Sequence, residues 1–324
     1  MRRRDLLTAL GAAAVYPLAG AARAQGTRHY RIGILETIAA DRNVANLSGL
    51  TRGLREHGYV EGQNLTLDYR SAQGQGERFP ALAAELVDMR VDLIVTRGTP
   101  AARAAKAATS TIPIVMAAIG EALGVGVIES LARPGGNLTG LSAFVTELAG
   151  KRIELLKETF PSMRRIGFMQ NMGNPVAAAQ WDATQAVAKA LGLAVDLFDV
   201  RTEPDIVRGF SELQSRRIDA LSVGIDALTQ ANAPAIVRLA AERKVLTAYP
   251  AREFVELGGL LSYGPSYPDL YRRAAGMIDK ILKGTTPGDL AVEQPAKLEL
   301  VVNSRTADTL GISFPRIFWR GPTR

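Results

Sequence analysis

Residues 92–108 read DLIVTRGTPAARAAKAA, and this stretch decides the fold. The apolar run from Asp92 to Thr96 predicts a buried strand, and the run from Pro100 to Ala108 predicts a helix. Thr99 suits the N-cap of that helix, and a proline suits its first position. Buried strands that pass into helices in this way are typical of parallel sheets covered by helices on both faces.

The same alternation continues on either side of this unit. Before it, the pattern predicts strands at 31–36 and 65–69, with helices at 44–57 and around 82–89. After it follow a strand at 112–117 and a helix at 122–131. A second series has strands at 165–169, 194–200, 220–225 and 245–249, with helices at 177–191, 206–215 and 234–243. A strand at 260–263, a helix at 269–283 and a strand at 298–302 complete the chain. Two such series predict an α/β protein with two doubly wound parallel-sheet lobes.

The first 24 residues have the pattern of an export signal. Arg2, Arg3 and Arg4 precede an apolar run from Leu6 to Ala22, and small residues allow cleavage after Ala24. The paired arginines resemble a twin-arginine signal, with the general secretory route as the alternative. A membrane anchor is less favoured because the run is shorter than the roughly 20 residues of a spanning helix. We therefore expect a mature protein in the periplasm.

The composition excludes several classes of function. The chain has no cysteine, which excludes disulfides, thiolate metal sites and cysteine nucleophiles. The net charge of +7 is scattered and partly due to the leader, so no nucleic-acid-binding face is expected. His29 and His57 are the only histidines, and neither belongs to a catalytic or zinc-binding motif. Gly124 and Gly126 begin like a dinucleotide loop, but Glu129 replaces its third glycine, so packing is the better interpretation. We predict no catalytic residue, metal or cofactor.

Candidate binding residues follow the predicted strands, where ligands of open parallel sheets bind. Gly98, Thr99 and Ala101 open a helix whose N-terminus could hold an anion, although ordinary capping would explain them equally well. Asp226 could pair with an ammonium group or cap a helix. The other candidates could contact a ligand or serve as turn and core residues: Thr37, Asn171, Asn174, Tyr249 and Tyr263.

Four long motifs resemble a known family. They lie at residues 53–87, 92–120, 130–142 and 258–284 and read GLREHGYVEGQNLTLDYRSAQGQGERFPALAAELV, DLIVTRGTPAARAAKAATSTIPIVMAAIG, SLARPGGNLTGLS and GGLLSYGPSYPDLYRRAAGMIDKILKG. In this order they resemble the ABC transporter substrate-binding proteins of type I periplasmic-binding fold, a family with tryptophan- and tyrosine-binding members.

The resemblance implies two lobes joined by three crossovers, with a ligand cleft between them. It places residues 25–140 and 264–293 in one lobe and 141–263 and 294–324 in the other. Thr99 and Ala101 match the family's helix-start anion site, and Asn171 and Asn174 match its second-lobe turn. Residues 119–123 depart from the usual Gly-Asp-Pro turn, and residues 314–324 depart from the usual acidic ending.

These observations favour a monomeric periplasmic carrier that captures a small polar solute and delivers it to an inner-membrane ABC permease. The solute class suggested is an amino acid or a related carboxylate. A sensor that presents its ligand state to a membrane receptor is the alternative. An α/β enzyme is a third hypothesis, which the missing catalytic signatures disfavour.

Overall fold

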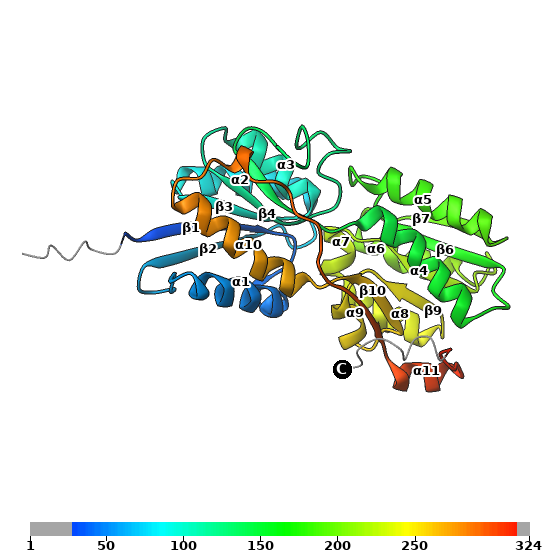
Figure 1. The fold of residues 1–324 in the computed structure, drawn as a ribbon. Helices are drawn as coiled ribbons and strands as arrows, with labels where there is room; N and C mark the ends of the chain where they lie inside the picture. The colour runs from blue at the N-terminus through cyan, green and yellow to red at the C-terminus, as the bar shows by residue number, and fades with distance from the viewer. Residues whose placement is uncertain (1–27, 316–324) are drawn as a thin grey trace, which may run out of the picture.

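The computed structural model describes residues 28–315. The chain forms two α/β lobes side by side, each with an open sheet covered by helices (Figure 1). The predicted export signal and most of the C-terminal tail lie outside the described residues.

The first lobe is built on a parallel sheet with the strand order β2-β1-β3-β4-β5. Its strands are β1 (Tyr30–Glu36), β2 (Leu65–Ser71), β3 (Leu93–Arg97), β4 (Ile114–Ile119) and β5 (Leu138–Ser142). Its helices are η1 (Ala40–Arg42), α1 (Val44–Glu56), η2 (Gly76–Arg78), α2 (Phe79–Asp88), α3 (Thr99–Ala108), α10 (Tyr267–Leu282) and η3 (Pro287–Asp289).

The second lobe has a six-stranded sheet with the order β11-β10-β9-β8-β6-β7. Its strands are β6 (Arg165–Gln170), β7 (Ala194–Asp199), β8 (Ala220–Val223), β9 (Leu246–Tyr249), β10 (Leu261–Pro265) and β11 (Leu298–Val302). Its helices are α4 (Val145–Thr159), α5 (Ala177–Ala190), α6 (Glu203–Glu212), α7 (Ala227–Ala231), α8 (Ala233–Glu242), α9 (Arg252–Glu256) and α11 (Ser304–Leu310). All neighbouring strands are parallel except β10 and β11, which pair antiparallel.

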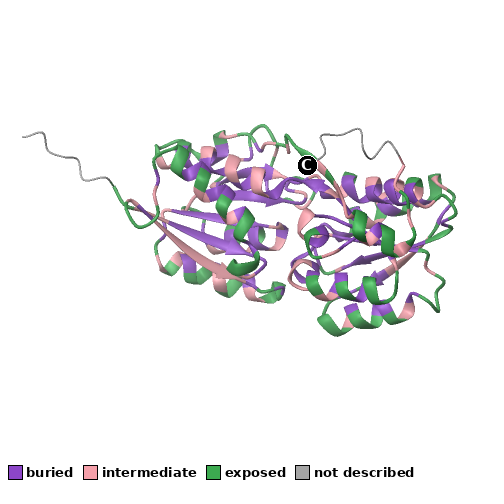
Figure 2. Cartoon of the chain, turned by 90° about the horizontal axis from the view of Figure 1, so that it is seen from below, coloured by how far each residue is buried: buried purple, intermediate pink, exposed green. Residues whose placement is uncertain are grey.

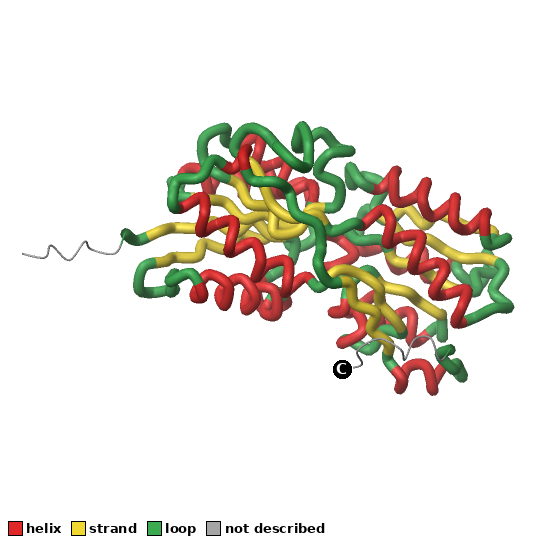
Figure 3. The backbone as a smooth tube through the Cα atoms, in the orientation of Figure 1, coloured by secondary structure: helices red, strands yellow, loops and turns green. Residues whose placement is uncertain are grey.

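The chain passes between the lobes three times, after β5, after β10 and after η3 (Figure 3). Helix α10 thereby returns to the first lobe and packs along α1 (Figure 1). The predicted two-lobed α/β fold is confirmed, while the lobe boundaries inferred from the resemblance stay a prediction.

Both sheets lie between layers of helices, and their central strands are buried throughout (Figure 2). Every residue of β3 and of β4 is buried, in keeping with the continuous apolar runs that predicted them. These strands hold the loops at their carboxyl ends in fixed positions.

One predicted helix, at residues 122–131, is wrong. This segment forms successive turns, and Val127 N–H donates to the carbonyl of Ala122. Gly124 and Gly126 lie within three residues of each other, and glycine is a poor helix former. Gly126 takes a left-handed φ of 69°, which closes a turn instead of continuing a helix.

The predicted N-cap of α3 is also wrong by one residue. Gly98 occupies the N-cap with a φ of 82°, and Thr99 is the first helical residue. Pro100 still lies in the first turn, where its missing N–H costs no hydrogen bond. The Thr99 hydroxyl is therefore not used to cap its own helix.

Candidate functional site

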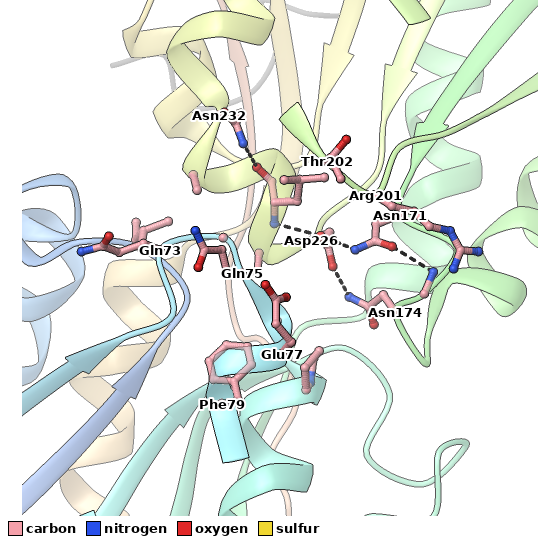
Figure 4. Close-up of a pocket in the computed structure, with 18 of the residues that line it drawn as sticks. Gln73, Gln75, Glu77, Phe79, Asn171, Asn174, Arg201, Thr202, Asp226 and Asn232 are labelled. Atoms are coloured by element: carbon pink, nitrogen blue, oxygen red, sulfur yellow. Dashed lines mark hydrogen bonds between the residues drawn. The ribbon is translucent and has the colours of Figure 1, made fainter. Parts of the chain in front are cut away.

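A large cleft lies between the lobes at the carboxyl ends of the parallel strands. We call this cavity, of about 1190 Å³, the outer cleft. Figure 4 shows Gln73, Gln75 and Glu77 of the first lobe facing Asn171, Arg201 and Asp226 of the second. The remaining polar side chains of its lining are Asp41, Arg42, Arg103, Asn174, Thr202, Glu203 and Asn232. The lining is thus rich in amides and in charges of both signs.

Asp226 organises the second-lobe wall of this cleft. Its Oδ1 accepts hydrogen bonds from Leu228 N–H at 2.8 Å and Asn171 Nδ2 at 3.1 Å, and its Oδ2 accepts one from Asn174 Nδ2 at 2.7 Å (Figure 4). Its backbone N–H donates to Thr229 Oγ1 at 3.1 Å, which completes a capping box on α7. Of the two roles considered for Asp226, helix capping is therefore present.

Two hydrogen bonds join the lobes beside the cleft. Thr37 Oγ1 donates to Gln230 Oε1 at 3.2 Å, and Arg42 Nη1 donates to the carbonyl of Ala231 at 2.6 Å. Both connect loops after β1 to α7. Gly74 packs on the same helix, since a Cβ there would come within 2.7 Å of the Ala231 methyl group.

A smaller cavity, of about 40 Å³, lies deeper between the lobes, and we call it the inner chamber. Thr37, Arg97 and Thr99 line it from the first lobe, and Asn174, Asp226 and Gln230 line it from the second. Tyr267 lines it from the start of α10. Its other side chains are small or aliphatic: Pro100, Ala118, Ile119, Ala143, Val145, Val176, Ile225 and Ala227.

The guanidinium of Arg97 is buried beside the inner chamber. Its Nη1 donates to Asn43 Oδ1 at 3.4 Å, and its Nη2 lies 3.7 Å from Glu253 Oε1. Its central carbon sits 4.5 Å from the centre of the Tyr267 ring. Burial opposes the charged form, but the electrostatic influence of Tyr271, Glu36 and Glu253 holds the pKa of Arg97 above its ordinary value. Arg97 is therefore a permanent cation with little solvent around it.

The structure brings six of the nine predicted site residues to the two cavities. Thr37, Gly98 and Thr99 line the inner chamber, Asn171 lines the outer cleft, and Asn174 and Asp226 line both. The other three line neither cavity: Ala101 is buried within α3, Tyr249 stacks on Phe254 with ring centres 5.0 Å apart, and Tyr263 lies partly buried in β10.

Sequence reasoning missed Arg97, Gln230 and Tyr267. Arg97 had a visible signal, because a charged residue at the carboxyl end of an apolar strand lies where ligands of such sheets bind. Gln230 and Tyr267 had none. Gln230 lies within a helix, and Tyr267 belongs to an element that crosses between the lobes.

No helix within residues 28–315 is long and apolar enough to cross a membrane. Over the same range, no three His, Cys, Asp or Glu side chains gather in the arrangement of a metal site.

Known proteins resemble this chain over most of its length. A "Tyrosine-binding protein" from Clostridioides difficile is 29% identical over 262 residues, covering 81% of this chain and 75% of that protein. A structure from Streptococcus pneumoniae in complex with L-Trp is 29% identical, with a TM-score of 0.82 over 90% of this chain and 98% of the other. A ligand-free, open substrate-binding protein from Clostridium difficile is 30% identical, with a TM-score of 0.64 over 88% and 96%. At nearly equal identity, the lobes thus superpose better on the L-Trp complex than on the open protein.

The profile of the ABC transporter substrate-binding protein family matches residues 31–318, which span both lobes and all three crossovers. The chain therefore belongs to the ABC transporter substrate-binding proteins, as its motifs predicted.

Proposed function

We propose that this protein captures a small polar solute, an amino acid or related carboxylate, between its lobes. It would act as an exported monomer in the periplasm and deliver the solute to the membrane permease of an ABC importer. The observation that carries the proposal is the inner chamber, where Thr37 and Thr99 of one lobe meet Asn174 and Asp226 of the other. A solute held by both sets of groups would favour the closed arrangement of the lobes.

The chemistry of the lining supports binding without turnover. Its polar groups are hydroxyls, amides and ion-forming side chains suited to hydrogen bonding. Neither histidine lies there: His29 contacts Thr66, and His57 lies beside Asp279. Nothing in this lining pairs a nucleophile with a base in the manner of hydrolytic enzymes.

The relatives support the choice of solute class. One is named for tyrosine binding, and another is a complex with L-Trp. Their identities to this chain leave room for a different side chain on the solute, so we propose the class and not the individual compound.

The test is a thermal-shift screen of the purified protein against amino acids, organic acids, sugars and nucleosides, followed by isothermal titration calorimetry. A compound present at 100 times its dissociation constant should stabilise the fold by about 2.7 kcal/mol. Asn174→Ala should weaken the binding of any compound found, because Asn174 lines both cavities. If no compound in any of the four classes shifts the melting temperature or releases heat, the proposed carrier function is wrong.

A further inference from the structure

Two buried polar groups of the inner chamber have unmet hydrogen-bonding capacity. Arg97 Nη2 and Thr99 Oγ1 have no hydrogen-bond partner among the described residues, and each side chain belongs to a residue only 2% exposed. Both residues line the chamber. Buried polar groups are nearly always paired, so these two mark a place where an external partner is missing.

The neighbours of Arg97 do not satisfy its Nη2 group. Glu253 is 3.7 Å away, which is too long for a hydrogen bond. Glu36 already accepts a hydrogen bond from Thr37 N–H at 3.0 Å and another from the Tyr271 hydroxyl. A cation withdrawn from water in this way gains strongly from an anion that both neutralises it and accepts its hydrogen bond.

The position of α3 strengthens the preference for an anion. Thr99 is the first residue of this ten-residue helix, so the unpaired amides and the positive end of the helix dipole lie beside its hydroxyl. The guanidinium, the hydroxyl and the helix end thus offer hydrogen-bond donors to the same small space.

Asp226, the acidic side chain of the chamber, has no comparable need. Its carboxylate already accepts from Leu228, Asn171 and Asn174 through both oxygens. The unmet demand in the inner chamber is therefore for an acceptor of hydrogen bonds and not for an ammonium group.

We infer that the solute is recognised by its carboxylate, which bridges Arg97 and Thr99, and that an amino group on the solute is dispensable. This inference rests on the proposed function and extends the substrate class to carboxylic acids without an α-amino group. The carboxylate is the end that enters the inner chamber. A cavity of roughly 150 Å³ is needed for a benzene ring, whereas the chamber measures about 40 Å³. The rest of the solute would lie in the outer cleft.

Calorimetry with two matched sets of compounds tests this inference. The first set is L-leucine, its deaminated acid isocaproate, and L-leucinamide. The second is L-tyrosine, its deaminated acid phloretate, and L-tyrosinamide. In at least one set, we expect the deaminated acid to bind within about tenfold of the amino acid. The amide should bind at least about tenfold more weakly, since it loses the charge-assisted hydrogen bonds.

Three variants connect the effect to the chamber. Thr99→Val keeps the side-chain shape and should weaken acid binding about tenfold, and Arg97→Gln should weaken it further. Thr96→Val is the matched control. Its hydroxyl is also buried and unpaired, but Thr96 does not line the chamber, so affinity should not change. Circular dichroism checks that each variant is folded, and the conservative Thr99→Val serves as the test should Arg97→Gln fail to fold.

The outcomes separate this inference from the proposed function. Binding of the amides with loss of the deaminated acids would overturn the inference, as would acid binding unchanged in Thr99→Val. Binding of sugars or nucleosides with no binding of any of the six compounds would also overturn it, while the carrier function would stand. No binding of any compound would reject both.

Discussion

At the scale of single residues, Asp226 combines two structural tasks at the edge of the cleft. It caps α7 and holds the amides of Asn171 and Asn174 in place. We predict that Asp226→Ala lowers the free energy of unfolding by about 3 kcal/mol. The lost cap accounts for about 1 kcal/mol, and the two amide donors left without their acceptor account for the rest.

Urea unfolding followed by circular dichroism measures this loss, with Asn303→Ala as the matched control. Asn303 caps α11 by accepting a hydrogen bond from Thr306 N–H at 3.1 Å, far from the cleft. Its removal should cost only about 1 kcal/mol. Equal losses in the two variants would show that Asp226 acts as a cap alone.

Residue-level prediction from sequence succeeded where position in a parallel sheet decides the outcome. Asp226 and Thr99 follow strands, and the carboxyl ends of those strands border the cleft. The same reasoning could not place Tyr249, which ends a strand but points into the core beside Phe254. Strand position fixes the end of the sheet on which a residue lies, whereas the direction of its side chain depends on packing.

At the scale of elements, the contact between α1 and α10 depends on small residues. A Cβ on Gly53 would lie 2.5 Å from the carbonyl oxygen of Arg272 and 2.7 Å from the methyl group of Ala275. Backbone cannot yield as a flexible side chain can, so the helices must separate. We predict that Gly53→Ala destabilises the protein by about 2 kcal/mol, as overpacking of a core does.

Gly276→Ala on α10 is the control for this prediction. Its added Cβ would meet only His57 Nε2, at an ordinary 3.7 Å. Alanine is the better helix former, so this variant should be unchanged or more stable by up to about 1 kcal/mol. Thermal unfolding of both variants decides the matter, and a Gly53→Ala protein as stable as Gly276→Ala would contradict the close-packing argument.

Elements with long apolar periodicity were predicted from the sequence, and those set by local backbone geometry were not. The strand at 92–96 and the helix at 100–108 lie within one or two residues of β3 and α3. Strand β5 was missed because LTGLS is short and polar, although Gly140 fits it closely against the backbone of Met116. Periodicity also gave no hint that residues 122–131 fold into turns.

At the scale of the whole molecule, alternation of strands and helices predicted two lobes but not how the end of the chain is used. Helix α10 joins the first lobe and β11 pairs antiparallel in the second, so the C-terminal third is shared between them. Sequence periodicity identifies a strand without giving its partner or direction. The crossovers were expected only because the motifs resemble those of a known family.

The division into lobes leads to a prediction about motion. The two lobes are joined beside the cleft by only a few polar contacts, such as Thr37 with Gln230 and Arg42 with Ala231. Such exposed or half-buried hydrogen bonds contribute about 1 kcal/mol each, so the protein without solute should also populate open arrangements. A solute that contacts both lobes should shift this population toward the closed one.

Double electron–electron resonance measures the shift, and the absence of native cysteine makes site-specific spin labelling direct. Labels on Glu77→Cys and Glu203→Cys face each other across the outer cleft from opposite lobes. Their distance distribution should become shorter and narrower when the tightest-binding compound of the calorimetric sets is added. Labels on Glu61→Cys and Glu77→Cys lie within one lobe and should report no change. An unchanged distribution for the pair across the cleft at saturating solute would mean that capture does not proceed by closure, because a rigid cleft needs no shift in population.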